Sequence, residues 1–339
     1  MNEPLQLAIV GVGNWGRNLV RHFAHARRAR LKYLCDRDGR TLATQLENHP
    51  GVQGVRDFQT VLDDPDVQAV VIATDAPTHF ELATAALKSG RHVFVEKPLA
   101  LNSDDAARLA ALSREVNRKL MVGHLLEYHP AVEAIGAMIR GGELGDVYYL
   151  YSQRINLGVV RANENAWWSL APHDVAVVCR LFDGAPVSVS AQGQCYLQAG
   201  IEDVVFASLK FADGRLAHLH VSWLDPHKIR KLTIVGTRKM VTFDDMSANE
   251  KVRLYDKGAE ISQAMRDFAE VVNLRVGDIV IPRIPGGEPL ALECRHFIDA
   301  VLDDKPVRTD GESGLRVVRV LEAGQRSLRE GGAAVVVQR

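Results

Sequence analysis

Apolar residues in the first 125 positions fall into short runs. These runs are rich in aliphatic and β-branched residues and lie at 5–10, 31–35, 67–73, 91–95 and 119–122. Segments with helical spacing of apolar residues separate them, at 17–23, 41–46, 58–62, 77–89 and 102–117. Short buried runs that alternate with amphipathic helices are typical of a doubly wound parallel sheet. This part of the chain is therefore predicted to be α/β.

The pattern changes after residue 125. Helices are predicted at 130–139 and 171–182, on either side of a tyrosine-rich strand at 147–155. Further strand patterns follow without helical segments between them, at 187–191, 204–211, 216–223 and 231–235. Consecutive strands of this kind predict a mainly antiparallel sheet. A loop rich in proline and glycine, 282–289, then leads to helices at 290–302 and 313–329.

A glycine-rich turn joins the first predicted strand to the first predicted helix. Its sequence is Gly11-Val12-Gly13-Asn14-Trp15-Gly16, which has the G-x-G-x-x-G spacing in the strand–turn–helix context of a dinucleotide-binding turn. In such a turn the first glycine bends the chain and the second lets a pyrophosphate approach the backbone. The third lets helix and strand pack closely. The N–H groups at the start of the helix are then expected to bind the phosphates.

Asp36 follows the second predicted strand, 20 residues after Gly16. A carboxylate at this place is expected to bind the hydroxyls of the adenosine ribose. Because a carboxylate repels a 2′-phosphate, the sequence predicts NAD in preference to NADP. Arg37 and Arg40 lie close by and keep NADP as the alternative, since an arginine can accept that phosphate.

Composition narrows the class of protein. The chain has 339 residues, a net charge of −1 and a pI near 6.9, which favours two domains and argues against a nucleic-acid-binding surface. Four scattered cysteines without a C-x-x-C pair indicate reduced thiols. The first strand begins within a few residues of the start, and no apolar run approaches the length of a membrane span. We therefore expect a cytoplasmic protein with no membrane or nucleic-acid partner. His218 and His220 share a strand face, but without a third ligand they are expected to pack in the sheet, and no metal site is predicted.

Glu96-Lys97-Pro98 comes directly after the strand predicted at 91–95. Ligands bind at the carboxyl edge of an open α/β sheet. A lysine held there can take the proton of a hydroxyl while hydride leaves the same carbon. The alternative is a solvated lysine that happens to follow a strand. Glu96 is expected either to hold the lysine or to contact the nicotinamide ribose.

Several motifs together resemble the glucose–fructose oxidoreductase/inositol dehydrogenase (Gfo/Idh/MocA) family. They are the glycine turn, Asp36, Ala73-Thr74 with His79, Glu96-Lys97-Pro98, Gly123-His124, Tyr128-His129-Pro130, Pro289-Leu290 and Asp310-Gly311-Glu312-Ser313-Gly314-Leu315. The resemblance spans almost the whole chain and implies an NAD-dependent oxidoreductase that acts on a CH–OH group, with Lys97 catalytic. The residues expected to bind the cofactor are Gly11, Gly13, Asn14, Trp15, Gly16, Asp36, Arg37, Thr74, His79, Glu96 and Lys97.

The resemblance and the element pattern together predict the domains. Residues 1–124 are expected to form a Rossmann dinucleotide-binding domain with a doubly wound parallel sheet. Residues 125–310 are expected to form an α+β substrate and oligomerisation domain with a large, open, mainly antiparallel sheet. The C-terminal segment 311–339 is expected to pack back on the first domain. The exposed face of the open sheet is either a substrate floor or a subunit interface, and the resemblance implies a homodimer or homotetramer.

A second catalytic candidate, His173, lies in the run Trp167-Trp168-Ser169-Leu170-Ala171-Pro172-His173-Asp174. Imidazole accepts protons near neutral pH, although a histidine at a helix start is more often a cap or a core residue. The resemblance places the histidine of the family's Asp-x-x-x-His motif on His173. The family's aspartate falls on Ser169, so the relay it implies is incomplete here. Asp174 either replaces that carboxylate or caps the helix.

Within the family, the sequence is most similar to nucleotide-sugar 3-dehydrogenases. These oxidise the C3 hydroxyl of UDP-N-acetylglucosamine, or of its uronic acid, before an aminotransferase acts, on the way to amino sugars of surface polysaccharide or lipid A. The expected substrate-binding residues are Lys97, Glu127, Arg154, Asn156, Arg161, Trp168, His173 and Asp174. Arg154 and Arg161 are expected to hold the charged part of the substrate, with a solvated strand edge as the alternative. Two other functions stay open: a dehydrogenase of a free sugar or polyol such as an inositol, and a non-catalytic NAD(H)-binding sensor.

Overall fold

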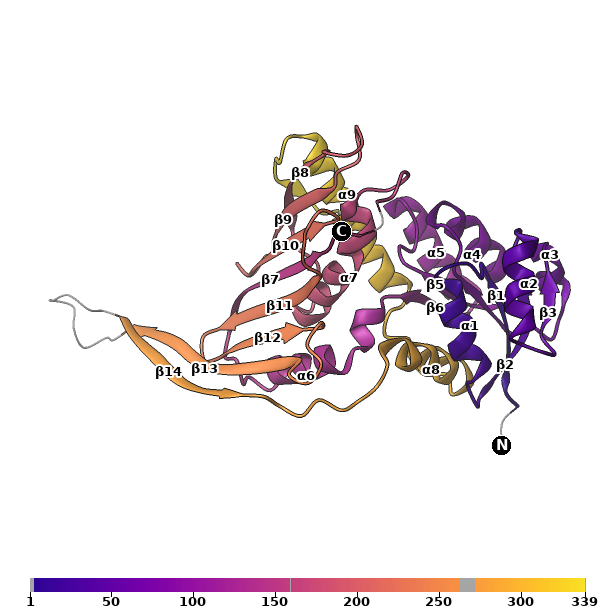
Figure 1. Ribbon diagram of the computed structural model, residues 1–339, viewed down its shortest axis with the longest axis horizontal. Coiled ribbons are helices and arrows are strands. Elements are labelled where there is room, and N and C mark those ends of the chain that lie inside the picture. Colours follow the sequence, from indigo (N-terminus) through magenta and orange to yellow (C-terminus); the bar gives the residue numbers. More distant parts are fainter. Residues whose placement is uncertain (1–2, 159, 262–271, 339) are drawn as a thin grey trace. The chain divides into compact units, whose positions relative to one another are not determined.

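The computed structural model describes residues 3–158, 160–261 and 272–338. The chain forms two compact units, which are considered separately (Figure 1). Unit 1 comprises 1–128 and 287–319, and unit 2 comprises 129–286 and 320–339. The expected boundary after residue 124 lies close to the observed one. The segment 287–310, expected in the second domain, groups with unit 1, and the C-terminal helix is divided between the units.

The sheet of unit 1 is parallel throughout and has the strand order β3-β2-β1-β4-β5-β6. Its strands are β1 (Leu5–Val10), β2 (Ala29–Cys35), β3 (Gln53–Val55), β4 (Ala69–Ile72), β5 (His92–Glu96) and β6 (Leu120–Gly123). The predicted doubly wound fold is confirmed. The short strand β3 was not anticipated. Because the strands are parallel, the segments that follow β2, β1, β4 and β5 meet at one edge of the sheet.

Helices accompany this sheet. They are α1 (Gly16–Ala24), α2 (Gly39–Glu47), α3 (Phe58–Asp63), η1 (Ala76–Thr78), α4 (His79–Lys88), α5 (Ser103–Glu115), η2 (Leu125–Tyr128) and α8 (Pro289–Leu302). Side-chain oxygens of Asp38, Asp57 and Asn102 cap α2, α3 and α5, as is usual for these residue types.

The core of unit 1 explains why α8 belongs to it. Phe23 of α1, Phe94 of β5 and Phe297 of α8 pack edge to face, with ring centroids 5.7–6.4 Å apart. All three are fully buried. The apolar face of α8 therefore completes the core that the parallel sheet and α1 leave open, although α8 lies far from them in the sequence.

The sheet of unit 2 has the order β14-β13-β12-β11-β7-β10-β9-β8-β15. Only the β7–β10 pair is parallel among the described strand pairs, so the mainly antiparallel prediction is confirmed. The strands are β7 (Val147–Ile155), β8 (Ser188–Gln194), β9 (Val204–Lys210), β10 (Leu216–Ser222), β11 (Ile229–Gly236), β12 (Met240–Asp244), β13 (Val252–Ile261), β14 (Val272–Val280) and β15 (Val335–Val336). The last four were not anticipated.

Unit 2 also contains α6 (Pro130–Arg140), α7 (Ala166–Leu181) and the C-terminal part of α9 (Gly311–Arg329). Helix α7 begins five residues before the predicted start because Asn165 caps it, accepting the N–H of Trp168 at 3.0 Å. Pro172 was expected in the first turn but lies inside the helix. Trp167 is fully buried, and its indole N–H donates to the carbonyl of Leu321 at 2.9 Å. No helix in the described ranges is long and apolar enough to span a membrane.

Candidate active site

The glycine turn leaves space for phosphate at one defined position. Gly11 has φ +84°, and a Cβ there would lie 2.7 Å from the backbone of Ala73. A Cβ on Gly16 would lie 2.0 Å from the carbonyl oxygen of Gly11. Gly13 differs, since a Cβ added to it would meet no described atom within 4 Å. Gly11 and Gly16 are thus required by packing, whereas the open space beside Gly13 fits the approach of a pyrophosphate.

This difference gives a prediction for Gly13→Ala. The variant should fold normally, because the added methyl group meets no protein atom among those described, but it should occupy the space that the phosphates need. We expect an affinity for NADH lower by roughly tenfold or more, about 1.4 kcal/mol. Titration of NADH fluorescence measures the affinity, and thermal unfolding without cofactor measures stability. Gly184→Ala in unit 2, where a Cβ also meets no described atom, is the matched control and should change neither quantity.

Asp36 is fixed relative to the glycine turn. Its Oδ2 accepts the backbone N–H of Val12 at 2.9 Å, and its Oδ1 accepts the N–H of Asp38 at 2.9 Å. The carboxylate therefore stands at the carboxyl end of β2, next to the turn that follows β1. This is the arrangement expected for recognition of an adenosine ribose. The residues present fit a dinucleotide: an open glycine position, a helix N-terminus and an acid on the neighbouring strand.

Asn14, Trp15 and Arg37 are the other predicted cofactor residues of this region. Asn14 and Arg37 are exposed, and the backbone carbonyl of Arg37 accepts two N–H groups of Arg56. Trp15 is 42% exposed and lies directly before α1, at the N-cap position. Its indole N–H donates to Oε1 of Glu96 at 2.6 Å. The contact joins the glycine turn to the end of β5.

Glu96 and Lys97 lie at the same sheet edge, at the end of β5. Glu96 is buried, and its Oε2 also accepts the backbone N–H of Lys97 at 3.3 Å. Burial raises the pKa of Glu96 to about 7, against the opposing effects of the Trp15 hydrogen bond and the charge of Lys97. Gly123 of β6 is needed beside it, since a Cβ there would lie 2.9 Å from Oε2 of Glu96. Glu96 thus anchors both Trp15 and the backbone that presents Lys97.

Thr74 and His79 were expected to contact the cofactor. His79 is buried, with Nδ1 2.8 Å from the carbonyl oxygen of Pro98 and Nε2 3.0 Å from that of Thr74. Burial lowers the pKa of His79, although the two carbonyls oppose that effect. The ring therefore connects the segments that follow β4 and β5, the second of which contains Lys97. The Thr74 hydroxyl bonds to that of Thr78 at 2.7 Å.

In unit 2, His173 and Trp168 are half-buried on α7. Ser169, at the position of the family's aspartate, is buried on the same helix one turn before His173. Asp174 does not cap the helix, which is a correction to one of the two expectations for it, because the cap is Asn165.

Arg154, a predicted substrate-binding residue, is buried and paired with Asp174. Its Nε lies 2.5 Å from Oδ2 of Asp174 and its Nη2 3.4 Å from Oδ1, and both side chains are only 9% exposed. Arg154 also faces Arg230 across the β7–β11 ladder, and the charge of Arg230 interacts favourably with Asp245 and, less strongly, with Asp174. Arg154 and Asp174 therefore form a buried salt bridge inside unit 2. For Arg154, the alternative of a solvated strand edge does not hold, because its side chain is buried.

The remaining predicted substrate residues differ in exposure. Arg161 is exposed, with its guanidinium 2.9 Å from the carboxylate of Glu164. Asn156 is half-buried after β7. Glu127 is buried in η2 of unit 1. Of the two arginines, only Arg161 thus presents its charge at the surface of its unit.

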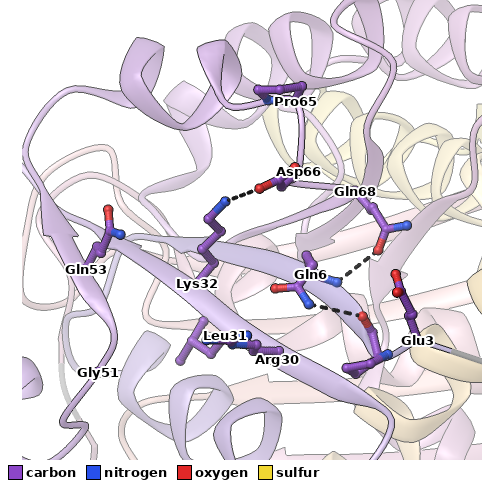
Figure 2. A pocket seen from close by; sticks show the side chains of 11 residues that line it. Glu3, Gln6, Arg30, Leu31, Lys32, Gly51, Gln53, Pro65, Asp66 and Gln68 are labelled. Carbon is purple, nitrogen blue, oxygen red and sulfur yellow. Dashed lines mark hydrogen bonds and ion pairs between the residues drawn. The ribbon is translucent and has the colours of Figure 1, made fainter.

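A polar hollow of about 660 Å³ lies at the opposite edge of the unit 1 sheet (Figure 2). Residues of the amino-terminal halves of β1 and β2 and residues near the starts of β3 and β4 line it, among them Gln6, Lys32 and Gln68. Lys32 pairs there with Asp66 at 2.9 Å, and the N–H of Gln6 donates to Gln68 at 3.0 Å. Because it lies at the amino ends of the strands, this hollow is separate from the edge that carries Asp36 and Lys97.

Glu293 of unit 1 is a buried carboxyl residue that sequence reasoning did not single out. Glu293, on α8, is fully buried in the described structure. The available signal was its position among Leu290, Cys294 and Phe297, which share one helix face at spacings of three and four residues.

Comparisons with known proteins agree with this arrangement. A model of the oxidoreductase family GFO_IDH_MocA, with an NAD-binding Rossmann fold, matches residues 5–124, and the GFO/IDH/MocA C-terminal domain matches residues 132–242. UDP-N-acetylglucosamine 3-dehydrogenase of Acidithiobacillus ferrooxidans is 28% identical over 75% of this chain and 76% of its own length. The scyllo-inositol 2-dehydrogenase (NAD(+)) of Bacillus subtilis is 25% identical over 98% of this chain and 96% of its own length. A crystal structure of a protein from Magnetospirillum magnetotacticum MS-1 is 30% identical, with a TM-score of 0.81 over 95% of this chain and 99% of that one.

Proposed function

The chain belongs to the GFO/IDH/MocA family of NAD-binding oxidoreductases, and we propose that it oxidises the C3 hydroxyl of a UDP-N-acetylhexosamine-type nucleotide sugar to the 3-keto sugar. The observation that carries the proposal is the position of Lys97. It follows β5 at the same sheet edge as the glycine turn and Asp36, and its backbone is tied to that turn through Glu96 and Trp15. Among the relatives, the A. ferrooxidans 3-dehydrogenase supports the substrate.

The residues of unit 1 would divide the work as follows. Asp36 and the turn around Gly13 hold the dinucleotide, and NAD supplies the hydride acceptor. Lys97 accepts the proton of the substrate hydroxyl as hydride leaves the same carbon. His79 and Glu96 keep the segment that bears Lys97 in place.

The residues of unit 2 would bind the substrate. His173 is still predicted to accept the proton as a second base or to hydrogen-bond to the substrate hydroxyl. Trp168, on the same helix, is still predicted to bind the substrate. Arg161 takes over the role first expected of both arginines, because its guanidinium is exposed whereas that of Arg154 is not. Arginine suits a diphosphate, to which it can donate two parallel hydrogen bonds.

One test separates this proposal from the two other functions. NAD⁺ reduction is followed by the near-ultraviolet absorbance of NADH with a panel of UDP-sugars and free polyols. Turnover with UDP-N-acetylglucosamine or its uronic acid, and none with inositols, is expected. Turnover with an inositol and with no UDP-sugar would establish the alternative that the B. subtilis relative favours. NADH binding without turnover of any alcohol would indicate a sensor.

The open sheet is proposed as the subunit interface. Large hydrophobic side chains stay exposed on it, including Tyr149, Tyr151 and Phe206. Tyr149 and Tyr151 are alternate residues of one strand and their rings stack, so they share a face. Light scattering is expected to give a homodimer or homotetramer, and a monomer at micromolar concentration would contradict this proposal.

A further inference from the structure

Glu293 is a carboxyl group buried in the core of unit 1. It lies in the first half of α8 with no exposed surface. Within the described part of the chain, neither carboxyl oxygen has a hydrogen-bond partner. Buried carboxylates are normally paired, hydrogen-bonded or bound to metal. An ionised Glu293 would therefore lack the contacts that stabilise a negative charge in a protein interior.

The packing of unit 1 places Glu293 opposite Glu96. Phe94 and Glu96 are alternate residues of β5 and point to the same side of the sheet. Phe297 and Glu293 are four residues apart on α8 and lie along one helix face. The rings of Phe94 and Phe297 are in contact, with centroids 5.7 Å apart. Glu96 and Glu293 therefore lie in the layer of side chains next to these two rings, between β5 and α8. The negative charge of Glu96 accordingly helps to raise the pKa of Glu293.

Among the residues that the structure describes, the charged groups that act on Glu293 are both acidic, Glu96 and Glu127. The ionisable groups that act on it or that it acts on are Glu96 of β5, Glu127 and Tyr128 of η2, and Cys294 of α8. Two cations of this region interact with other groups. The charge of Lys97 affects the pKa values of Glu96 and His124, and the guanidinium of Arg308 donates to the backbone carbonyl of Glu127 at 2.8 Å. Among the described residues, no group of three or more metal-ligating side chains is present.

Glu96 is the better place for a negative charge. It accepts hydrogen bonds from the Trp15 indole and from the N–H of Lys97, and it lies beside the Lys97 charge. His124, which is also buried and has its pKa lowered to about 3 by burial, is neutral and brings no positive charge. When two nearby carboxyl groups compete, the one with donors and a cation ionises and the other keeps its proton.

We propose that Glu293 is a proton-binding site: it holds a proton as a neutral carboxylic acid, so that once Glu96 has ionised the Glu96–Glu293 pair carries one negative charge, on Glu96, beside Lys97. Burial and the charges of Glu96 and Glu127 all raise the pKa of Glu293, in agreement with this assignment.

The consequence for catalysis rests on the proposed function. To accept the hydroxyl proton, Lys97 would first have to be in its neutral amine form, and NAD, when bound, would accept the hydride. Lys97 would then become an ammonium, whose charge the neighbouring Glu96 carboxylate could balance. A second ionised carboxylate would leave an uncompensated negative charge in the interior, which a neutral Glu293 avoids.

Infrared difference spectroscopy tests the resident proton without substrate. Wild-type protein at a pH above the pKa of Glu96, which is about 7, should show a carboxylic-acid C=O band that shifts in D₂O and is missing from Glu293→Gln. Glu288→Gln, at the N-terminus of the same helix with its carboxylate about half exposed, is the matched control and should keep the band. If the amide is not tolerated, Glu293→Met is used, since a buried acid without charge can be replaced by an apolar chain. A spectrum with no acid band that depends on residue 293 overturns the proposal.

The pH dependence of stability gives a second, independent readout. A raised folded-state pKa means that the folded chain keeps this proton while the unfolded chain loses it above about pH 4.3. The stabilisation is complete below that pH and is lost as the pH rises toward the folded-state pKa. The ratio of unfolding constants, wild type over Glu293→Gln, should therefore rise by up to about tenfold per pH unit. A ratio that does not change with pH contradicts the proposal. Neither experiment uses the sugar, so failure of the dehydrogenase assignment would be seen separately.

Discussion

Lys97→Ala is expected to lower kcat by roughly two to four orders of magnitude, the usual contribution of a positioned acid–base group. NAD binding should be nearly unchanged, because the dinucleotide is held by the glycine turn and Asp36. Steady-state kinetics with the best UDP-sugar measures the first quantity, and isothermal calorimetry with NADH measures the second.

The matched control for this variant is Lys88→Ala, which removes an exposed lysine from the last turn of α4. It should leave kcat and NADH affinity unchanged. If Lys97→Ala loses cofactor affinity while its kcat at saturating cofactor stays near that of the wild type, Lys97 binds the cofactor and the proton is accepted elsewhere.

Arg154→Ala is expected to destabilise the protein by about 3–5 kcal/mol, because it leaves the Asp174 carboxylate buried without its partner. The neighbouring Arg230 still offsets part of the Asp174 charge in the variant. We therefore expect a loss of stability at the lower end of this range. Urea unfolding measures the loss.

Two comparisons separate a structural role of Arg154 from substrate binding. Arg161→Ala breaks an exposed pair with Glu164 and should cost less than about 1 kcal/mol. It should raise KM for the nucleotide sugar instead. The double variant Arg154→Met/Asp174→Leu removes both buried charges and should regain most of the lost stability. Normal stability of Arg154→Ala together with a raised KM would make Arg154 a substrate-binding residue after all.

Much of unit 1 was predictable because each element carries its own local signal. Buried aliphatic runs, the glycine turn and side-chain caps such as Asn102 are read from neighbouring residues. The assignment of α8 to this unit was not predictable in that way. It depends on Phe297 meeting Phe23 and Phe94, residues that lie far away in the sequence. The start of α7 was predicted five residues too late, because the cap that begins the helix, Asn165, was not recognised in the sequence.

The candidate site was predictable where function depends on backbone position. Gly13, Asp36 and Lys97 follow neighbouring parallel strands, and the sheet topology alone brings them to one edge. Side-chain partners were not predictable. Arg154 looked available because its partner, Asp174, lies 20 residues away on a helix. Glu96 acts on Glu293 because Phe297 of α8 packs on Phe94 of β5, and no pattern within either segment indicates that packing.

The proposed reaction requires hydride to leave C3 of a UDP-sugar and pass to NAD. Oxidation of UDP-N-acetylglucosamine, or of its uronic acid, deuterated only at C3 tests this most directly, with mass spectrometry of the reduced cofactor as the readout. We predict one deuterium in the NADH and a primary isotope effect that disappears with material labelled at C4. Unlabelled NADH formed from the C3-deuterated sugar would contradict the proposed reaction.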